Sequence, residues 1–268
     1  MRNSKISHLS DNTQLGAVLY MKRIKLVVAY DGTNYCGWQK QPNAITVEEV
    51  INKQLSQLLG EDIEVIGSSR TDSGVHALGN VAVFDTETKI PAQKISYALN
   101  QRLPEDIRIQ SSSEVPFDFH PRYLKSCKTY EYRILNREFL LPTMRLYYHF
   151  VYKKLDTGLM QEAANYLIGE HDFKSFCSSK TQVQSTIRTI YSLDVICKGD
   201  EIILRVRGNG FLYNMVRIIA GTLINVGLGI TKPSRIPEIL SAKERLVAGP
   251  TAPAHGLTLV DIEFKELL

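Results

Sequence analysis

The segment GSSRTDSGVHALG, residues 67–79, brings three chemically capable side chains into one short stretch. Asp72 supplies a carboxylate that can attack carbon or accept a proton, Arg70 a guanidinium that can bind phosphate, and His76 an imidazole. A surface turn explains the same composition, because aspartate hydrogen-bonds its own backbone and glycine tolerates positive φ. Spacing alone favours the turn, so the rest of the chain must decide between a turn and an active-site loop.

Short strands and helices alternate around this segment in the first half of the chain. The strand-like runs are rich in valine and isoleucine, whereas the helical runs carry their apolar residues on one face. A capping box at Thr46 and Glu49 and a final Gly60 mark the ends of the first helix. The predicted strands span residues 23–30, 62–67, 80–86 and 106–111, and the predicted helices span residues 46–60 and 91–103.

The second half of the chain follows the same order of elements. Its predicted strands span residues 128–136, 186–198, 201–208 and 255–264, and its predicted helices span residues 156–169 and 211–227. The turn Gly199-Asp200 is short enough to require antiparallel pairing, which excludes a doubly wound parallel sheet. We therefore predict an α+β fold with two related halves, each resembling a split βαβ unit.

The composition is that of an ordinary soluble globular protein. The 268 residues are 44% hydrophobic and 22% charged, and the net charge of +4 is compatible with a polyanionic partner without requiring one. The four cysteines have neither metal-binding nor redox spacing, so a reduced, cytoplasmic setting is expected. Residues 1–20 lack the apolar core of a signal peptide and are expected to form a disordered extension, with a start at Met21 as the alternative.

The motifs of several common chemistries are missing. There is no Walker loop, and the GNG and GLG triplets at residues 208–210 and 227–229 lack the spacing of a dinucleotide site. The six histidines are scattered, with no HExxH or paired Cys/His cluster, so no metal is expected. No nucleophile elbow of the G-x-S-x-G kind is present. The sequence thus predicts neither a cofactor nor a metal.

One predicted helix, within GFLYNMVRIIAGTLINVGLG, is almost wholly apolar but carries Arg217 at its middle. A membrane span is disfavoured, because a central arginine costs about 2.5–3.5 kcal/mol on insertion scales. In a soluble core, an unpaired buried charge is very costly, so Arg217 either extends to the surface or pairs with a carboxylate. Extension to the surface is the usual outcome, and the partly polar neighbours Tyr213 and Asn214 make a pair with a loop carboxylate the alternative.

A third segment, residues 119–137, interleaves cations with tyrosines. Cations bind phosphates and aromatic faces stack on exposed bases, so the pattern fits contact with RNA. A half-exposed strand with buried tyrosines and a solvated basic face explains it equally well. The cations are Arg122, Lys125, Lys128, Arg133 and Arg137, and the tyrosines are Tyr123, Tyr130 and Tyr132.

Five ordered motifs together resemble the tRNA pseudouridine synthase A family, from about residue 21 to residue 264. They are AYDGTNYCGWQKQPN, SRTDSGVHALGNVAVF, KTYEYRI, GNGFLYNMVRIIAGTLINVG and AGPTAPAHGLTLVDIEF. The family pattern has glycine before the loop arginine and alanine after the aspartate, where this chain has Ser69 and Ser73. Both residues are small, so the loop backbone is expected to keep its course.

The resemblance implies two ferredoxin-like halves, residues 21–115 and 116–268, in one continuous antiparallel sheet flanked by helices, with the active cleft between them. It implies a homodimer that acts on tRNA in the cytoplasm without cofactor, metal or membrane. The implied activity isomerises uridine to pseudouridine at tRNA positions 38–40 of the anticodon stem-loop. The N1–C1′ bond breaks, the base turns, and the sugar is rejoined through C5.

The resemblance also implies roles for four side chains. Asp72 corresponds to the catalytic aspartate, and Arg217 to the arginine that pairs with it, keeps it ionised and fixes its direction. Arg70 fills the space left by a flipped base or holds a phosphate. Tyr130 stacks on the target base, and transfer of the C5 proton is its second candidate task. Whether Asp72 attacks C1′ or removes a proton from C2′ is left open.

The other motif residues are assigned to structure, and two rival functions are kept. His76 is expected to order the loop or to contact RNA, Asp31 to close a strand-end turn, and Trp38 to anchor packing. One rival is a non-catalytic RNA-binding module or tRNA folding chaperone of the same fold. The other is a nucleoside glycosidase that releases the base. The Arg-Thr-Asp loop together with Arg217 and Tyr130 favours the isomerase over both.

Overall fold

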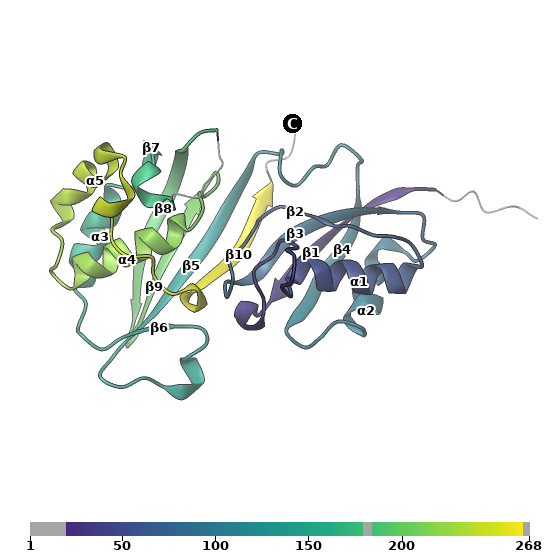
Figure 1. Ribbon diagram of the computed structural model, residues 1–268, viewed down its shortest axis with the longest axis horizontal. Helices are drawn as coiled ribbons and strands as arrows, with labels where there is room; N and C mark the ends of the chain where they lie inside the picture. The colour runs from purple at the N-terminus through teal and green to yellow at the C-terminus, as the bar shows by residue number, and fades with distance from the viewer. Residues whose placement is uncertain (1–19, 179–183, 265–268) are drawn as a thin grey trace, which may run out of the picture.

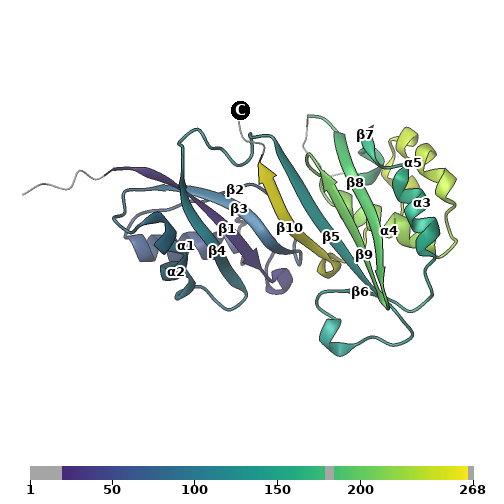
Figure 2. The same ribbon diagram turned by 180° about the vertical axis from the view of Figure 1, so that it is seen from behind.

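The computed structural model describes residues 20–178 and 184–264. The predicted disordered extension over residues 1–20 therefore lies outside the described residues, apart from Tyr20. Two lobes lie side by side along one continuous sheet, and the helices of both lobes cover the same face of it (Figure 1). The opposite view shows the strands in front of the helices (Figure 2). No helix in the described residues is long and apolar enough to cross a membrane.

The first half folds as β1-α1-β2-β3-α2-β4. Thr46 accepts a hydrogen bond from the Glu49 amide at the start of α1, and Gly60 ends it with φ +70°. Three antiparallel strands lie in the order β4-β1-β3, and the two-residue β2 pairs with β3. The bounds are β1 Lys22–Tyr30, α1 Val47–Leu59, β2 Ile66–Gly67, β3 His76–Thr86, α2 Ala92–Asn100 and β4 Ile107–Val115.

The second half repeats this plan as β5-α3-β8-β9-α4-β10. Its strands lie in the order β10-β5-β9-β8, which is the order of the first half, and β6, β7 and α5 are additions. The bounds are β5 Ser126–Asn136, β6 His149–Val151, α3 Thr157–Asn165, β7 Gly169–Asp172, β8 Ile187–Lys198, β9 Glu201–Gly208, α4 Met215–Gly227, α5 Ile236–Ala242 and β10 Leu257–Phe264.

The predicted α+β fold with one sheet flanked by helices is confirmed, and the sheet is mixed. Most neighbouring strands are antiparallel, but the halves join through a short parallel pairing of β10 with β3, and β5 pairs in parallel with β6. The junction is parallel because the last strand of the chain returns to the middle of the sheet. The strand order agrees with a division of the chain after residue 115, which stays a prediction.

Several predicted elements are shorter than expected. The predicted helices 91–103 and 156–169 form helix only over Ala92–Asn100 and Thr157–Asn165. The run 62–67 contributes only the short β2, because side chains of α1 bind its backbone: the amide of Ile63 donates to Ser56 and that of Val65 to Asn52, each at 2.9 Å. The predicted helix 211–227 begins at Met215, because Asn214 has φ +62° and interrupts the helical backbone. The sequence pattern did not predict β6, β7 or α5.

Close packing on α4 positions the second half of the site. Eleven of its thirteen residues are buried. A Cβ on Gly221 would lie 1.9 Å from the carbonyl oxygen of Pro250, so only glycine allows the segment 250–253 to approach this closely. The amide of Ala252 donates to the carbonyl of Arg217 at 3.1 Å. The segment after α5 is therefore held against the turn of α4 that carries Arg217.

Candidate active site

The loop that carries Asp72 rests on the turn that follows β1. The amide of Trp38 donates to the carbonyl of Thr71 at 3.1 Å, and the amide of Gly74 donates to the carbonyl of Tyr35 at 3.3 Å. Gly37 has φ +84°, and a Cβ there would lie 2.5 Å from the Thr71 carbonyl oxygen. The motif AYDGTNYCGWQKQPN therefore packs against the motif SRTDSGVHALGNVAVF and fixes the backbone of the loop that carries Asp72.

The two positions that depart from the family pattern fit this loop. Ser69 is bracketed by Asn80, whose side-chain amide accepts from the Ser69 amide at 3.3 Å and donates to its carbonyl at 3.1 Å. The hydroxyl of Ser73 donates to the carbonyl of Tyr35 at 3.3 Å. Neither serine is among the described non-glycine residues with positive φ. Nothing in the backbone therefore requires glycine at residue 69.

Asp72 and Arg217 meet across the junction of the two halves. Arg217 Nη1 lies 3.4 Å from Asp72 Oδ2, and both side chains are largely buried, at 17% and 19% exposure. The same Nη1 donates to Asn214 Oδ1 at 2.8 Å, and Nε donates to the Ala252 carbonyl at 2.8 Å. The guanidinium is thus fixed on three sides, and Asp72 is its only carboxylate partner among the described residues.

The electrostatics of Asp72 differ from those of an ordinary paired carboxylate. Burial raises the pKa of its carboxyl above the usual value, and the positive charge and hydrogen bond of Arg217 lower it only in part. A carboxylate whose proton affinity is raised is a stronger base and nucleophile once ionised. Arg217 therefore holds and orients a buried carboxylate whose pKa stays above the usual value.

Tyr130 lies near Asp72, on the helix-covered face of β5. It is almost fully buried, and its ring meets that of Phe211 edge-on with centroids 5.3 Å apart. Burial raises the pKa of its hydroxyl to about 12, and the negative charge of Asp72 contributes to the same shift. The hydroxyl is therefore protonated at neutral pH and able to donate a hydrogen bond or a proton.

A large cavity lies between the two halves, and Asp72 and Tyr130 form part of its wall. Its volume is about 990 Å³, close to the upper limit of typical ligand pockets, about 300–1,000 Å³. Its wall combines the loop of the first half, the start of β5 and the segment before α4. The lining residues that matter here are Arg70, Asp72, Arg122, Tyr123, Lys128, Tyr130 and Phe211. The cavity holds a carboxylate, aromatic rings and three cations.

Arg70 lies on the cavity wall but does not pair with Asp72. It is exposed, and no described carboxylate forms an ion pair with it. Its charge lowers the pKa of Arg122, after the larger effect of burial, so the two guanidinium groups lie in each other's field. Two like charges at the rim of a cavity, with no ion-pair partner among the described carboxylates, are suited to an anion.

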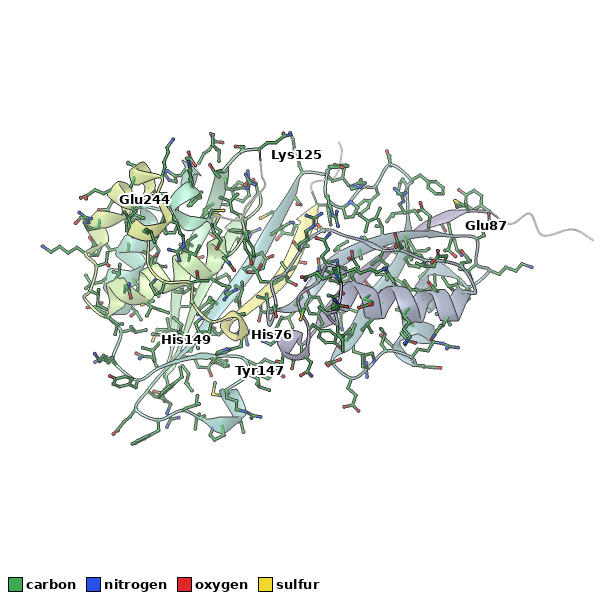
Figure 3. The ribbon with its side chains drawn as sticks, in the orientation of Figure 1. His76, Glu87, Lys125, Tyr147, His149 and Glu244 are labelled. Carbon is green, nitrogen blue, oxygen red and sulfur yellow. The ribbon has the colours of Figure 1, made fainter. Side chains whose placement is uncertain are left out.

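The predicted basic segment separates onto different surfaces. Arg122 and Lys128 line the cavity and donate to the carbonyls of Gly67 and Ser68, at 2.8 and 3.0 Å. Lys125 is exposed, at the edge of the molecule opposite to His76 and Tyr147 (Figure 3). Arg133 points to the other face of β5 and pairs with Glu131, which also binds Arg205. Arg133 is therefore occupied within the protein.

His76 is not part of the cavity wall, and it binds the turn after β1 and the segment before β6. It is buried, its Nδ1 accepts from the Gly32 amide at 3.1 Å, and its Nε2 lies 3.0 Å from the Leu146 carbonyl oxygen. Asp31 caps the turn through the amide and hydroxyl of Thr33. Trp38 is fully buried. Asp31 closes the strand-end turn and Trp38 packs in the core, as predicted from the sequence, whereas the role of His76 in loop ordering or RNA contact stays a prediction.

Asn214 is a site residue that the sequence analysis names only as a polar neighbour of Arg217. Its side chain accepts from Arg217 and donates to the hydroxyl of Ser178 at 2.8 Å. A signal was present, because asparagine is among the few non-glycine residues that adopt positive φ, and this one stands where an apolar helix should already have begun. No group of described His, Cys, Asp and Glu residues is arranged to hold a metal ion.

Comparison with known proteins gives consistent matches. The family described as tRNA pseudouridine synthase matches residues 26–124 and 163–265. The chain is 54% identical over 245 residues to tRNA pseudouridine synthase A of Ruminiclostridium cellulolyticum, and 49% identical over 244 residues to that of Brevibacillus brevis. Each alignment covers 91% of this chain and 100% of the relative. A solved archaeal box H/ACA Nop10–Cbf5 complex is similar at 13% identity and a TM-score of 0.35, over 75% of this chain and 44% of that one, too distantly to bear on function.

Proposed function

The chain belongs to the tRNA pseudouridine synthase family, and we propose that it isomerises uridine to pseudouridine in tRNA with Asp72 as its catalytic group. The observation that carries the proposal is a buried carboxylate, oriented by Arg217, in the wall of a cavity of about 990 Å³. The cavity is large enough for a nucleotide turned out of its stack, and the cations on its wall match the phosphates that accompany one.

The proposed reaction needs few protein groups other than Asp72. The carboxylate either attacks C1′ of the ribose or removes a proton from C2′, and either step releases the base from its N1–C1′ bond. The base turns and C5 bonds to C1′, which either displaces the Asp72 carboxylate from C1′ or is accompanied by return of the proton to C2′. C5 then loses its proton, and N1 ends with one. Arg217 keeps the carboxylate directed at the sugar. No redox step is involved, and atoms balance within the nucleoside and water.

We assign supporting roles to Tyr130 and Arg70. Tyr130 stacks on the target base, and its protonated hydroxyl is a candidate partner for the C5 proton; its place on the cavity wall and its proximity to Asp72 support both tasks. Arg70 occupies the space left by the flipped base or holds a phosphate. Its exposure at the rim and its lack of a described carboxylate partner support this role.

Tritium release provides the direct test. tRNA carrying uridine tritiated at C5 is expected to lose tritium on incubation with the protein, while the RNA chain keeps all its bases. A nucleoside glycosidase would leave an abasic site that aniline cleaves, and an RNA chaperone would release nothing. Abasic sites, or full retention of tritium by every uridine of the anticodon stem-loop, would contradict the proposed function.

We also propose a cytoplasmic homodimer that acts at tRNA positions 38–40. The support is the family resemblance and the modest net charge of +4, which is small for a single chain that grips a large polyanion. A second subunit would hold the body of the tRNA while one cleft acts. Full-length tRNA is then expected to bind much more tightly than an isolated anticodon stem-loop, to a species of twice the chain mass. A monomer that binds both RNAs equally contradicts this.

Substitutions at Tyr130 separate its two roles. If the hydroxyl handles the C5 proton, Tyr130→Phe should bind RNA normally but stall after the glycosidic bond breaks. If stacking dominates, Tyr130→Phe should be mild, whereas Tyr130→Ala should weaken substrate binding by about 5- to 150-fold, since a stacked base contributes about 1–3 kcal/mol. Single-turnover rates and tritium release distinguish these outcomes. Near-normal activity of both variants would remove Tyr130 from the site.

RNA binding is expected to weaken as the pH rises through about 8 because of Lys128. Burial, and secondarily the charge of Arg122, lower the pKa of Lys128 to about 8, so this cation is protonated at pH 7 and largely neutral at pH 9. The salt dependence of binding should become shallower by about one phosphate contact over this range. Lys128→Arg stays charged and should abolish the pH effect; a pH effect that persists in this variant would assign it to another group.

A further inference from the structure

Tyr123 is an exposed aromatic ring at the rim of the cavity. Its side chain is 83% exposed, although it belongs to the cavity lining. The ring stacks on that of His120, with centroids 4.1 Å apart and an interplanar angle of 18°. One face of the tyrosine is therefore covered by a second ring, and the other has no aromatic neighbour among the described residues. A flat, supported and exposed ring of this kind is a stacking surface.

The turn beneath this ring pair is held in place. The amides of Tyr123 and Leu124 both donate to the carbonyl of His120, at 3.1 and 3.2 Å, and the amide of Arg122 donates to His120 Nδ1 at 3.3 Å. Just before the turn, Phe119 packs edge-on against Phe264 at the end of β10, with centroids 5.0 Å apart. The stacking surface is therefore built before any ligand arrives, which lowers the entropic cost of binding.

Cations without counter-ions lie beside the ring. Arg122 and Lys128 are anchored by backbone carbonyls of the segment that leads to Asp72, and Arg70 follows on the same segment. No described carboxylate forms an ion pair with any of the three. Glu48 is the carboxylate whose field reaches Arg122, and it is already engaged by the amide of Lys40 at 2.8 Å. The positive charges of Arg70, Arg122 and Lys128 are therefore available to an anion in the cavity.

We propose that Tyr123, with Arg122 and Lys128, forms a subsite for the nucleotide next to the reacting uridine. The ring of Tyr123 stacks on that neighbouring base, and the two cations hold the phosphate that links it to the target. This inference rests on the proposed function and extends it to a second nucleotide. Because every base has a flat face, the subsite positions the RNA strand without selecting its sequence.

The subsite replaces interactions that base flipping removes. When the target uridine leaves the stack, its neighbour loses one stacking partner. A ring at the rim of the same cavity can supply the missing contact, while the cations hold the backbone between the flipped nucleotide and its neighbour. The volume of about 990 Å³ leaves room for more than the reacting base. Tyr123 is therefore a positioning residue that acts through RNA geometry.

Kinetics of three variants test the ring. Tyr123→Ala is expected to raise KM about 5- to 150-fold, the range for loss of one stacked base, with kcat within about threefold of wild type. Tyr123→Phe should retain wild-type KM. Tyr97→Ala is the matched control, because Tyr97 is 68% exposed on α2 and also lies beside a cation, Lys94, but is not part of the cavity wall. Equal KM for Tyr123→Ala and Tyr97→Ala would overturn the proposal.

Modified RNA tests the contact itself. Two anticodon stem-loop substrates carry an abasic residue on the 5′ or the 3′ side of the target uridine. For one of them, removing the base should raise the wild-type KM but add nothing to that of Tyr123→Ala, because the interaction is already absent. Additive effects for both substrates would exclude stacking by Tyr123. Tritium release by wild type checks the proposed function separately, so failure of the subsite and failure of the activity give different results.

Discussion

Replacing Asp72 with asparagine is expected to abolish turnover and to leave the fold as stable as wild type or more stable. The amide cannot attack C1′ or accept a proton, so the rate should fall by at least the 100-fold low end of general acid–base contributions. Because burial raises the pKa of Asp72 above its unfolded value, its ionised form opposes folding, and this loss of stability is complete once the pH exceeds the folded pKa. The neutral amide removes that cost at pH 7.

A second aspartate provides the matched control. Burial alone would raise the pKa of Asp31, but hydrogen bonds from Thr33 and Tyr147 outweigh it, so the pKa lies below its usual value. Ionised Asp31 therefore stabilises the fold at neutral pH, and this contribution is lost as the pH falls through the folded pKa. Asp31→Asn should lower the melting temperature and keep measurable turnover. Turnover of Asp72→Asn within tenfold of wild type would show that Asp72 is not the catalytic group.

The contrast between Asp31 and Asp72 shows which roles can be predicted from neighbouring residues and which cannot. Asp31 follows a strand and precedes Gly-Thr, which is enough to predict a capped turn. The carboxylate of Asp72 is also in a glycine- and serine-rich loop, and its neighbours alone favour a turn. Its different role depends on burial against the second half and on Arg217, which is 145 residues away along the chain. Only the resemblance of five ordered motifs brought the two together in advance.

The basic segment shows what the alternation of side chains along a strand predicts and what it does not. Alternation along β5 places Lys128 and Tyr130 on one face and Glu131 and Arg133 on the other, and this follows from the two-residue repeat of a strand. The pairing of Arg133 with Glu131 follows from the same repeat, because the two residues are two positions apart on one strand. The second contact of Glu131 does not, because it depends on the register that sets Glu131 opposite Arg205 of β9.

The junction of the two halves was the feature that the sequence predicted least well. The hairpin of β8 and β9 was predictable from Gly199-Asp200, and Gly199 indeed adopts φ +62°. The parallel contact between β10 and β3 pairs only Thr258 with His76 and Leu259 with Ala77. No local pattern specifies a two-residue contact between residues 182 positions apart along the chain. It arises because β10 completes the second half and thereby closes against the first.

Replacing Arg217 with lysine is expected to lower kcat/KM by about two to four orders of magnitude while keeping the positive charge. Lysine cannot bond Ala252 and Asp72 at once, because it lacks the planar fork of the guanidinium. The guanidinium also bonds Asn214, so a lysine that keeps one of the three contacts loses two. Hydrogen bonds to charged groups contribute about 1.5–3 kcal/mol each, and the loss of two accounts for an effect of this size. The remaining charge should not restore the direction of the carboxylate.

The pH dependence of this variant distinguishes loss of geometry from general damage. Arg217 lowers the pKa of Asp72 against the larger effect of burial, so weakening this contact raises the pKa further. The acid limb of the profile of kcat/KM should therefore move to higher pH in Arg217→Lys. Asn214→Gly is the control, because glycine keeps the positive φ but removes one contact to the guanidinium, and should show a smaller loss with a smaller shift. An acid limb that stays in place, with activity within threefold of wild type, would show that Arg217 does not govern Asp72.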